Sequence, residues 1–253
     1  MSRGLLARFV RHPRGTVQTA WLGLRARRRR AAEDRAARRS CAFLRAEGLA
    51  PVVERRITGE TAPLESLGRK ATDLERLYRA VRRKRCRTVL EFGCGLSTIV
   101  MAAALRRNER KTGVAGRVWA VETAQAWTDL VRAATPPDLR PYLHITTADA
   151  ELTVWDGQLC HIFSALPNVS PSLIYVDGPD SQQVKGEHRG LTFCDGRNAV
   201  AADVLLYESS LAPGAEIYVD GRVPNADFLR ANLKRRYRVH VDRVHRVTRF
   251  VLR

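Results

Sequence analysis

The chain has 253 residues, 45% of them hydrophobic, and a formal net charge of +18 at pH 7. This length suits one α/β domain with an extension, and the hydrophobic content is enough for a buried core. No run of about 18 apolar residues occurs, so we expect no transmembrane helix. The charged amino terminus is not followed by the apolar stretch of a secretory signal, which favours a cytoplasmic protein.

The positive charge is concentrated at the amino-terminal end. Residues 1–46 hold 13 arginines against Glu33 and Asp34, a formal charge of +11, which leaves +7 for the other 207 residues. We expect 1–46 to be an Arg-rich extension, helical or partly disordered. Attraction to anionic lipid, nucleic acid or an acidic glycan is one interpretation of this charge, and a solvated arm is the other.

The five cysteines predict neither a metal site nor a disulfide framework. Their number is odd and no two of them form a CxxC pair, which favours a reducing compartment. They are Cys41, Cys86, Cys94, Cys160 and Cys194.

Residues 47–86 read as a helical lead-in that packs on the core. A helix over 31–47 should end at Gly48 and Pro51, and 52–57 could form a short strand. A second helix opens at Ala71, and its apolar residues keep a spacing of three and four.

From residue 87 to the end, strands and helices alternate. Such alternation predicts a doubly wound, mainly parallel sheet with helices on both faces. The last two strands are too close for a crossover helix and should form an antiparallel hairpin, which makes a seven-stranded α/β domain over 87–253. The predicted strands are 87–92, 117–122, 142–147, 172–177, 215–220, 237–241 and 246–252, with helices over 98–107, 124–134, 198–210 and 225–234.

A strand, a glycine turn and a helix start follow one another between residues 87 and 98. The first N–H groups of a helix have no intrahelical partner, so this arrangement predicts a ligand site. The third glycine of the dinucleotide pattern is absent, since position 98 is threonine. The candidate ligand residues are Glu91, Gly93, Gly95, Ser97 and Thr98.

An acid ends, or closely follows, each of the first three strands. Glu122 closes the second strand, where it could accept hydrogen bonds from ribose hydroxyls. Asp149 follows the third strand, where it could accept a hydrogen bond from an adenine amino group. A nicotinamide dinucleotide has no cationic amine for Glu91. The methionine part of S-adenosylmethionine has an α-ammonium for Glu91 and a carboxylate for the N–H groups and hydroxyls of the turn. The combination favours S-adenosylmethionine.

From about residue 70 to the end, the chain resembles the class I S-adenosylmethionine-dependent methyltransferases. Glu91-Phe92-Gly93-Cys94-Gly95 is similar to their first motif, although Leu96-Ser97 stands where many members have a further glycine. Glu122 and Asp149 match the ribose-side and adenine-side acids, and Asp177-Gly178-Pro179 stands where the fourth motif ends. The segment 217–229 resembles a bacterial subgroup whose acceptors are largely unassigned.

Asp177 and Asp220 end the fourth and fifth strands, which should be neighbours in the sheet. Similar metal-dependent O-methyltransferases hold a divalent cation at these two strand ends with a following Asn, whereas this chain has Gly221. We therefore predict no metal ligands. Asp177 and Asp220 are assigned as catalytic residues that orient or deprotonate an acceptor hydroxyl. The alternative role of Asp177 is to brace the Gly178-Pro179 turn.

Two insertions could face the acceptor. The polar segment 179–197 is a candidate lid and supplies His188 as a candidate base, with a solvated loop histidine as the alternative. The insertion 151–170, with Trp155, His161 and Phe163, either lines the acceptor pocket or forms a small satellite core.

The function expected from these features is O-methyl transfer to a hydroxyl of a small molecule or glycan. One alternative is an RNA or protein methyltransferase that uses 1–46 as an electrostatic arm. Another is a non-catalytic protein of this fold at a membrane surface or in an assembly. The sequence leaves the acceptor's identity and the oligomeric state open.

Overall fold

The computed structural model of the chain describes residues 14–193 and 200–253. Residues 1–13 lie outside this description, as do 194–199, which hold Cys194, the end of the predicted lid and the start of the predicted helix over 198–210.

The central sheet has seven strands in the order β3-β2-β1-β6-β8-β10-β9. The first five of these pair in parallel, whereas β10 is antiparallel to both of its neighbours. The predicted doubly wound sheet with a terminal antiparallel hairpin is therefore confirmed. The strands are β1 (Thr88–Phe92), β2 (Arg117–Glu122), β3 (Leu143–Thr147), β6 (Leu173–Val176), β8 (Glu216–Asp220), β9 (Tyr237–Asp242) and β10 (Val247–Leu252).

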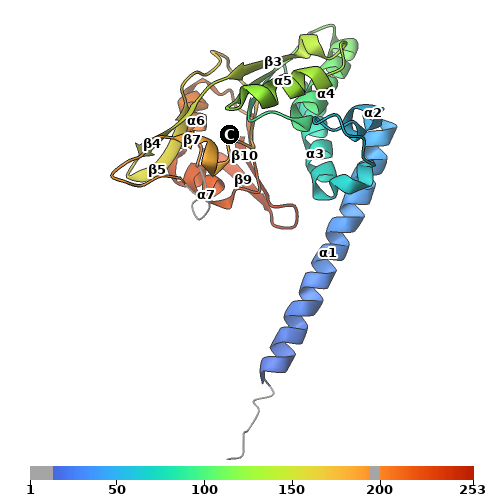
Figure 1. The fold of residues 1–253 in the computed structure, drawn as a ribbon, viewed down its shortest axis with the longest axis vertical. Coiled ribbons are helices and arrows are strands. Elements are labelled where there is room, and N and C mark those ends of the chain that lie inside the picture. The colour runs from blue at the N-terminus through green and yellow to red at the C-terminus, as the bar shows by residue number, and fades with distance from the viewer. Residues whose placement is uncertain (1–13, 194–199) are drawn as a thin grey trace, which may run out of the picture.

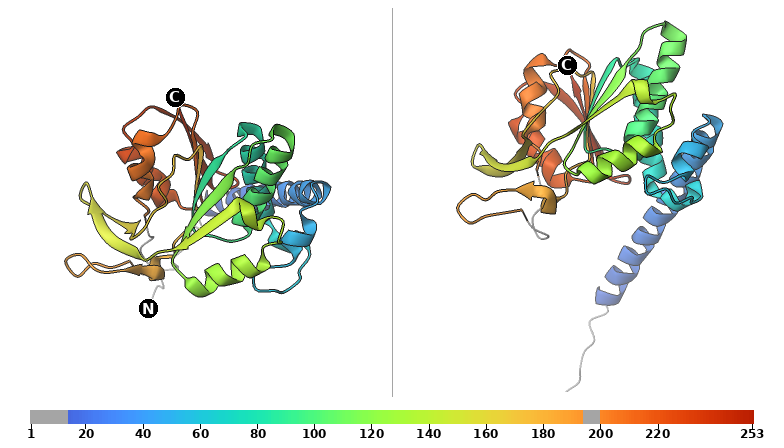
Figure 2. Two further views of the ribbon diagram at one scale, coloured as in Figure 1. Left: turned by 90° about the horizontal axis from the view of Figure 1, so that it is seen from above. Right: turned by 45° about the horizontal axis from the view of Figure 1, so that its top comes forward.

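Helices cover both faces of the sheet (Figure 2). Alternate residues of β1 point to opposite faces, so Val89 joins one apolar cluster with α3, α4 and α5. Leu90 and Phe92 join the other cluster, with α6 and α7. The helices are α3 (Arg69–Lys84), α4 (Leu96–Thr112), α5 (Gln125–Ala134), α6 (Asp203–Tyr207) and α7 (Val223–Asn232), with short 3-10 turns η1 (Leu64–Leu67), η2 (Arg140–Tyr142), η3 (Ser181–Gln183) and η4 (Glu208–Ser210).

The carboxyl-terminal end of the long helix α1 (Arg14–Ala46) docks on the core. Cys41 and Leu44 are buried in the cluster that contains α3. Residues 25–31, which include five arginines, are all exposed. Figure 1 shows the amino-terminal part of α1 projecting away from the body of the molecule.

The predicted strand over 52–57 is wrong, because a short helix, α2 (Ala50–Glu54), occupies its first half. Pro51 stands in the first turn of α2, where its fixed φ and missing N–H favour a helix start. Val53 is buried in the core with Leu49. The only pairing in this stretch is an isolated bridge between Arg55 and Thr61 within the described chain.

A small second sheet, in the order β5-β4-β7, is built from the two insertions. Its strands are β4 (Ala150–Trp155), β5 (Gln158–Phe163) and β7 (Val184–Lys185). Asp156 and Gly157 both have positive φ, as the tight turn of a two-residue hairpin requires. Phe163 stacks on Phe92 at 5.8 Å between ring centroids, so the insertion packs on the core, as the satellite-core interpretation expects.

Within the described residues, no helix is both long enough and apolar enough to cross a membrane.

The docking of α1 can be tested at Leu44. Its side chain is fully buried, so Leu44→Ala should lower the free energy of unfolding by about 2–4 kcal/mol through lost burial and a residual cavity. Arg30→Ala, on the exposed part of the same helix, should change it by less than about 0.5 kcal/mol. Urea denaturation measures both. Equal effects of the two substitutions would contradict the docking of α1 described above.

Candidate active site

The candidate site lies where β1, β6 and β8 end. Phe92 pairs with Val176, and Val176 pairs with Val219, so the residues that follow these strands meet at one edge of the sheet. The turn after β1, Asp177 after β6 and Asp220 at the end of β8 are therefore neighbours. The carboxyl edge of an open α/β sheet is where such folds bind ligands.

The two glycines of the turn, Gly93 and Gly95, differ in their steric surroundings. Gly93 has a φ of +98°, and a Cβ there would approach the backbone nitrogen of Gly178 to 3.2 Å. Both observations require glycine at this position. Gly95 has extended backbone, and a Cβ there would meet no atom within 4 Å. The turn is therefore closed at Gly93, against the next strand, and open at Gly95.

Glu91 braces the turn from below. Its carboxylate is fully buried and accepts hydrogen bonds from Ser97 Oγ at 2.5 Å and Thr98 Oγ1 at 2.6 Å. Thr98 Oγ1 in turn accepts the Gly95 N–H at 2.9 Å. Burial raises the pKa of Glu91 to about 8, against the lowering effect of the two hydroxyls.

The predicted ligand contacts of Glu91, Ser97 and Thr98 are revised by this arrangement. Glu91 and Thr98 have no exposed surface, and the Ser97 hydroxyl points to Glu91. All three fix the shape of the turn. In this conformation a ligand's carboxylate would meet the backbone N–H groups at the start of α4, because the N–H groups of Gly93, Cys94 and Gly95 already donate within the chain.

Glu122 ties the end of β2 to the turn. Its Oε1 accepts the Thr123 N–H at 2.8 Å and the Ala124 N–H at 3.1 Å, while Oε2 accepts the Cys94 N–H at 3.2 Å. The side chain stands at the position expected for a ribose-binding acid, although binding itself stays a prediction.

Asp149 directly precedes β4 and is half-exposed. Its Oδ1 forms an ion pair with Lys185 Nζ at 2.8 Å. The second sheet thus brings the segment after Pro179 against the predicted adenine-side acid. An adenine amino group at Asp149 would have to share the carboxylate with Lys185 or displace it.

A pocket of about 270 Å³ opens beside the turn. Gly95 and Ser97 form one wall, and Asp177 and Asp220 form another, so the pocket brings together residues that the sequence predicted separately. The lead-in contributes a third wall, which the sequence analysis missed. The residues that line the pocket are Arg56, Ile57, Thr58, Lys70, Asp73, Leu74, Leu77, Cys94, Gly95, Leu96, Ser97, Trp127, Tyr175, Asp177 and Asp220.

Three carboxyl groups of this pocket influence one another. Burial, followed by the negative charge of Asp220, raises the pKa of Asp73 to about 6 and that of Asp177 to about 6. Burial also raises the pKa of Asp220, while Arg69 and Arg76 lower it. Water reaches the Asp177 side chain through the pocket mouth, so we expect its pKa shift to be smaller than that of Asp73, which is 5% exposed.

Arg222 holds the turn that carries Asp177. Its guanidinium donates to the Asp177 and Pro179 carbonyl oxygens, each at 2.8 Å. The Gly178-Pro179 peptide bond is cis. The arginine therefore fixes the backbone while leaving the Asp177 carboxylate to face the pocket.

His188 is not brought to this site. It lies in an exposed tight turn, where its backbone exchanges two hydrogen bonds with Leu191, and it is not among the residues that line the pocket. The role of His188 as a base stays a prediction that this conformation does not support. The segment around it follows β7 and the second sheet rather than folding over Asp177.

Within the described chain, no group of three or more His, Cys, Asp or Glu side chains is arranged to hold a metal ion. Cys94 lies in the turn itself, and burial followed by the charge of Glu122 raises the pKa of its thiol, which makes it a poor nucleophile.

Comparison with known proteins gives one family. The sequence model of a family described as a methyltransferase domain matches residues 90–221. No curated protein matches the chain.

Solved structures give weaker likenesses. The SAH-bound methyltransferase PaMTH1 of Podospora anserina is 12% identical over 98% of this chain and 100% of that chain, with a TM-score of 0.45. A methyltransferase from Geobacter sulfurreducens is 17% identical over 72% and 78%, with a TM-score of 0.44. A ribosomal protein L11 methylase from Lactobacillus delbrueckii subsp. bulgaricus is 14% identical over 72% and 78%, with a TM-score of 0.38. TM-scores this low support no argument about the acceptor.

The raised pKa of Asp73 predicts a pH-dependent stability. Its pKa is about 6 in the folded chain and about 3.9 in an unfolded one, so the folded state favours the protonated form. The free energy of unfolding should therefore fall, by up to roughly 2 kcal/mol, as pH rises from about 4 to about 6. Asp73→Asn should lack this component.

The measurement is urea unfolding of both proteins between pH 4 and 7.5. The stability of Asp73→Asn relative to the natural chain should increase with pH over that window. Parallel pH profiles of the two proteins would show that the pKa of Asp73 is not raised in the folded state.

Proposed function

The chain belongs to the methyltransferase-domain family and is an S-adenosylmethionine-dependent methyltransferase, and on that premise we propose that it methylates a hydroxyl oxygen of a small molecule or glycan. The family match covers residues 90–221, from within β1 to just past β8. That range contains the glycine turn and both strand-end aspartates. The acceptor is the part of the function that rests on the chemistry of the pocket.

The site fits the cofactor on two observations. The open face of Gly95 leaves room where the turn borders the pocket. The pocket wall carries Asp73, Asp177 and Asp220, and carboxylates suit the α-ammonium and sulfonium charges of S-adenosylmethionine. The methionine end would therefore lie between the turn and these acids, with its carboxylate at the N–H groups of the helix start.

Glu122 and Asp149 would hold the nucleoside end. Glu122 accepts hydrogen bonds from the backbone N–H and the thiol of Cys94, and a ribose hydroxyl would join them or displace the thiol. Asp149 would accept from the adenine amino group at the expense of its ion pair with Lys185.

The carboxylates of Asp177 and Asp220 lie together in the wall of the pocket. This observation favours an oxygen atom as the methyl acceptor. When bound, S-adenosylmethionine supplies a methyl group that its sulfonium makes electrophilic. Asp177 would take the proton of the acceptor hydroxyl, since burial raises its pKa above the usual range of a carboxyl group and makes it a stronger base that is still ionised at neutral pH. Asp220 would accept a hydrogen bond from the acceptor and keep the pKa of Asp177 raised.

The remaining contribution of the chain is positioning. Arg222 fixes the backbone at Asp177, and the α3 side of the pocket, with Lys70 and Asp73, restricts how an acceptor enters. The pocket volume is just below the roughly 300–1,000 Å³ typical of drug-sized ligands, which favours a small acceptor or the end of a glycan.

A nucleic-acid acceptor is the second candidate, favoured by one observation. Residues 25–31 expose five arginines on a projecting helix, which would attract a phosphate backbone. The same segment would also suit peripheral contact with an anionic membrane. Both remain proposals about residues 1–46 and do not depend on the pocket.

Donor binding can be tested at Glu122. Glu122→Ala should weaken S-adenosylmethionine binding at least about 10-fold in calorimetric titration, which is about 1.4 kcal/mol. Thr123→Ala keeps the carboxylate and removes only the hydroxyl that donates to it at 3.1 Å, so its affinity should stay close to that of the natural chain. The natural chain should not bind NAD. Equal donor affinity in Glu122→Ala would overturn the ribose assignment.

Catalysis can be tested at Asp177. Asp177→Asn should lower the transfer rate roughly 10²–10⁴-fold at saturating donor, because it removes the general base. In the natural chain the rate should rise with pH through the raised pKa of Asp177, since the base must be ionised, and the variant should lose this rise. Asp227→Asn alters an exposed carboxylate on α7, outside the residues that line the pocket, and should leave the rate unchanged.

The assay would follow methyl transfer to catechol, p-nitrophenol, glucose and mixed transfer RNA. Transfer to a hydroxyl compound that depends on Asp177 supports the proposal. Transfer to RNA alone would favour the second candidate, and an Asp177→Asn variant of full activity would exclude this carboxylate as the base.

A further inference from the structure

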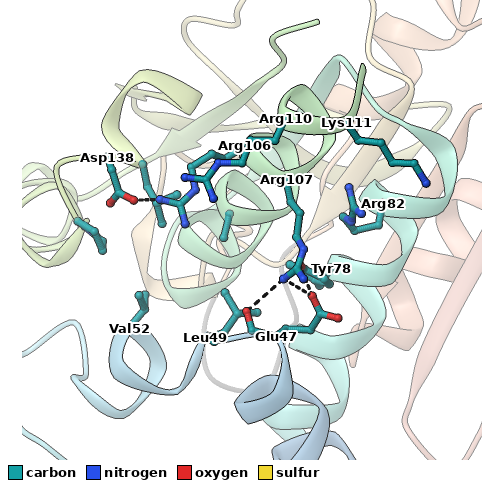
Figure 3. Close-up of a pocket in the computed structure, with 14 residues that line it drawn as sticks. Glu47, Leu49, Val52, Tyr78, Arg82, Arg106, Arg107, Arg110, Lys111 and Asp138 are labelled. Carbon is teal, nitrogen blue, oxygen red and sulfur yellow. Dashed lines mark hydrogen bonds and ion pairs between the residues drawn. The ribbon is translucent and has the colours of Figure 1, made fainter. Parts of the chain in front are cut away.

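A second, larger pocket lies at the far end of α4 from the glycine turn (Figure 3). Its volume is about 770 Å³, and its walls come from residues 47–52, from α3, from the last turns of α4 and from 136–139. Along α4, Gly95 and Arg110 are separated by about 22 Å of helix. A ligand held here would therefore be distinct from the methyl donor.

Basic side chains dominate this second pocket. Five cations and two carboxylates line it, which leaves a formal charge of +3. Figure 3 shows these cations gathered on α4 and α3, across the pocket from Leu49 and Val52. The cations are Arg82, Arg106, Arg107, Arg110 and Lys111, and the carboxylates are Glu47 and Asp138.

The two carboxylates are already neutralised. Arg107 pairs with Glu47 at 2.7 Å, and Arg106 pairs with Asp138. Each of these ion pairs joins α4 to another wall of the pocket. They hold the pocket's shape and remove both negative charges from the balance.

Three cations keep their charge uncompensated. Arg82 donates to Asn108 Oδ1 at 2.5 Å, a neutral acceptor that orients the guanidinium without balancing it. Arg110 and Lys111 are exposed, and neither forms an ion pair with a described residue. Cations in the last turn of a helix do interact favourably with its dipole, which accounts for Arg110 and Lys111. Arg82 lies in the last turn of α3, so the ends of two helices bring these three cations to one pocket.

The bottom of the pocket is apolar. Leu49, Ala103 and Leu139 are buried there, and Val52 is partly exposed beside them. These three residues belong to the apolar core of the domain, and their exposed edges, together with Val52, form the floor below the cations. An apolar floor below a basic rim fits a ligand that has an anionic head and an apolar body.

We propose that this pocket binds a diphosphate ester with an apolar organic body. A diphosphate carries several negative charges at neutral pH and can engage three separate cations, whereas a single carboxylate cannot. The diphosphate would lie among Arg82, Arg110 and Lys111, and the organic body would cover Leu49, Val52 and Leu139. The inference concerns a binding site and holds whether or not the methyl acceptor is a hydroxyl.

The test is calorimetric titration of the full chain with geranyl diphosphate and with inorganic pyrophosphate. Geranyl diphosphate should bind at least 10-fold more tightly than pyrophosphate, because its body reaches the apolar floor. The double variant Arg110→Ala, Lys111→Ala should weaken both at least 10-fold and leave S-adenosylmethionine affinity unchanged. Val52→Ser should reduce the preference for geranyl diphosphate.

The matched control is Arg236→Ala, Arg238→Ala, which removes the same charge from exposed positions at the far edge of the sheet. It should leave both affinities within twofold of the natural chain. Equal weakening by the two double variants would indicate nonspecific attraction to a basic protein and overturn the proposal. So would an absence of binding at millimolar pyrophosphate and geranyl diphosphate. Binding to phosphatidylglycerol vesicles alone, lost with Arg110 and Lys111, would replace the proposed ligand by a membrane surface.

Discussion

The contact between Gly93 and Gly178 is the constraint on which the site depends. Two turns, one after β1 and one after β6, approach so closely that neither position has space for a side chain. This contact sets Asp177 beside the cofactor turn instead of several ångströms away. Glu91 stabilises the same turn by accepting hydrogen bonds from the hydroxyl groups of Ser97 and Thr98, so the acid of the first motif has a structural role. Buried backbone and hydroxyl groups therefore determine the shape of the two turns at this edge of the sheet. The charged side chains that face the pocket are attached to these turns.

Much of the fold could be predicted from the sequence because its strands are short apolar runs bounded by turn residues or acids. β1, β2 and β8 begin and end within a residue of the predicted limits. The stretch 52–57 failed because Val52 and Val53 have strand propensity, while Pro51 starts a helix whose buried face only the packing reveals. Tertiary packing overrode propensity there.

The positions of the strand-end acids could be predicted better than the walls of the pocket. Strand-end acids at Glu122 and Asp149 follow from the chain order, since every parallel strand delivers its end to one edge of the sheet. Asp73 was missed because an acid near the start of a helix reads as a favourable helix-terminal charge. The sequence around Asp73 does not indicate that α3 passes near the carboxyl end of the sheet. The position of His188 could not be predicted, because loop sequence does not encode the direction in which a hairpin leaves the domain.

The projecting part of α1 has a mechanical consequence. From Arg29, whose guanidinium contacts the Arg243 carbonyl, the helix runs back to Arg14 over about 22 Å (Figure 1). A flexible arm samples all directions, whereas a continuous helix holds whatever it binds at one distance and one bearing from the body. Any anionic partner captured by the exposed arginines would be presented to the enzyme in a restricted geometry. The helix would then select partners by their dimensions. It would raise the effective concentration at the active site of only those partners whose methylated atom lies at a suitable distance from their charged part.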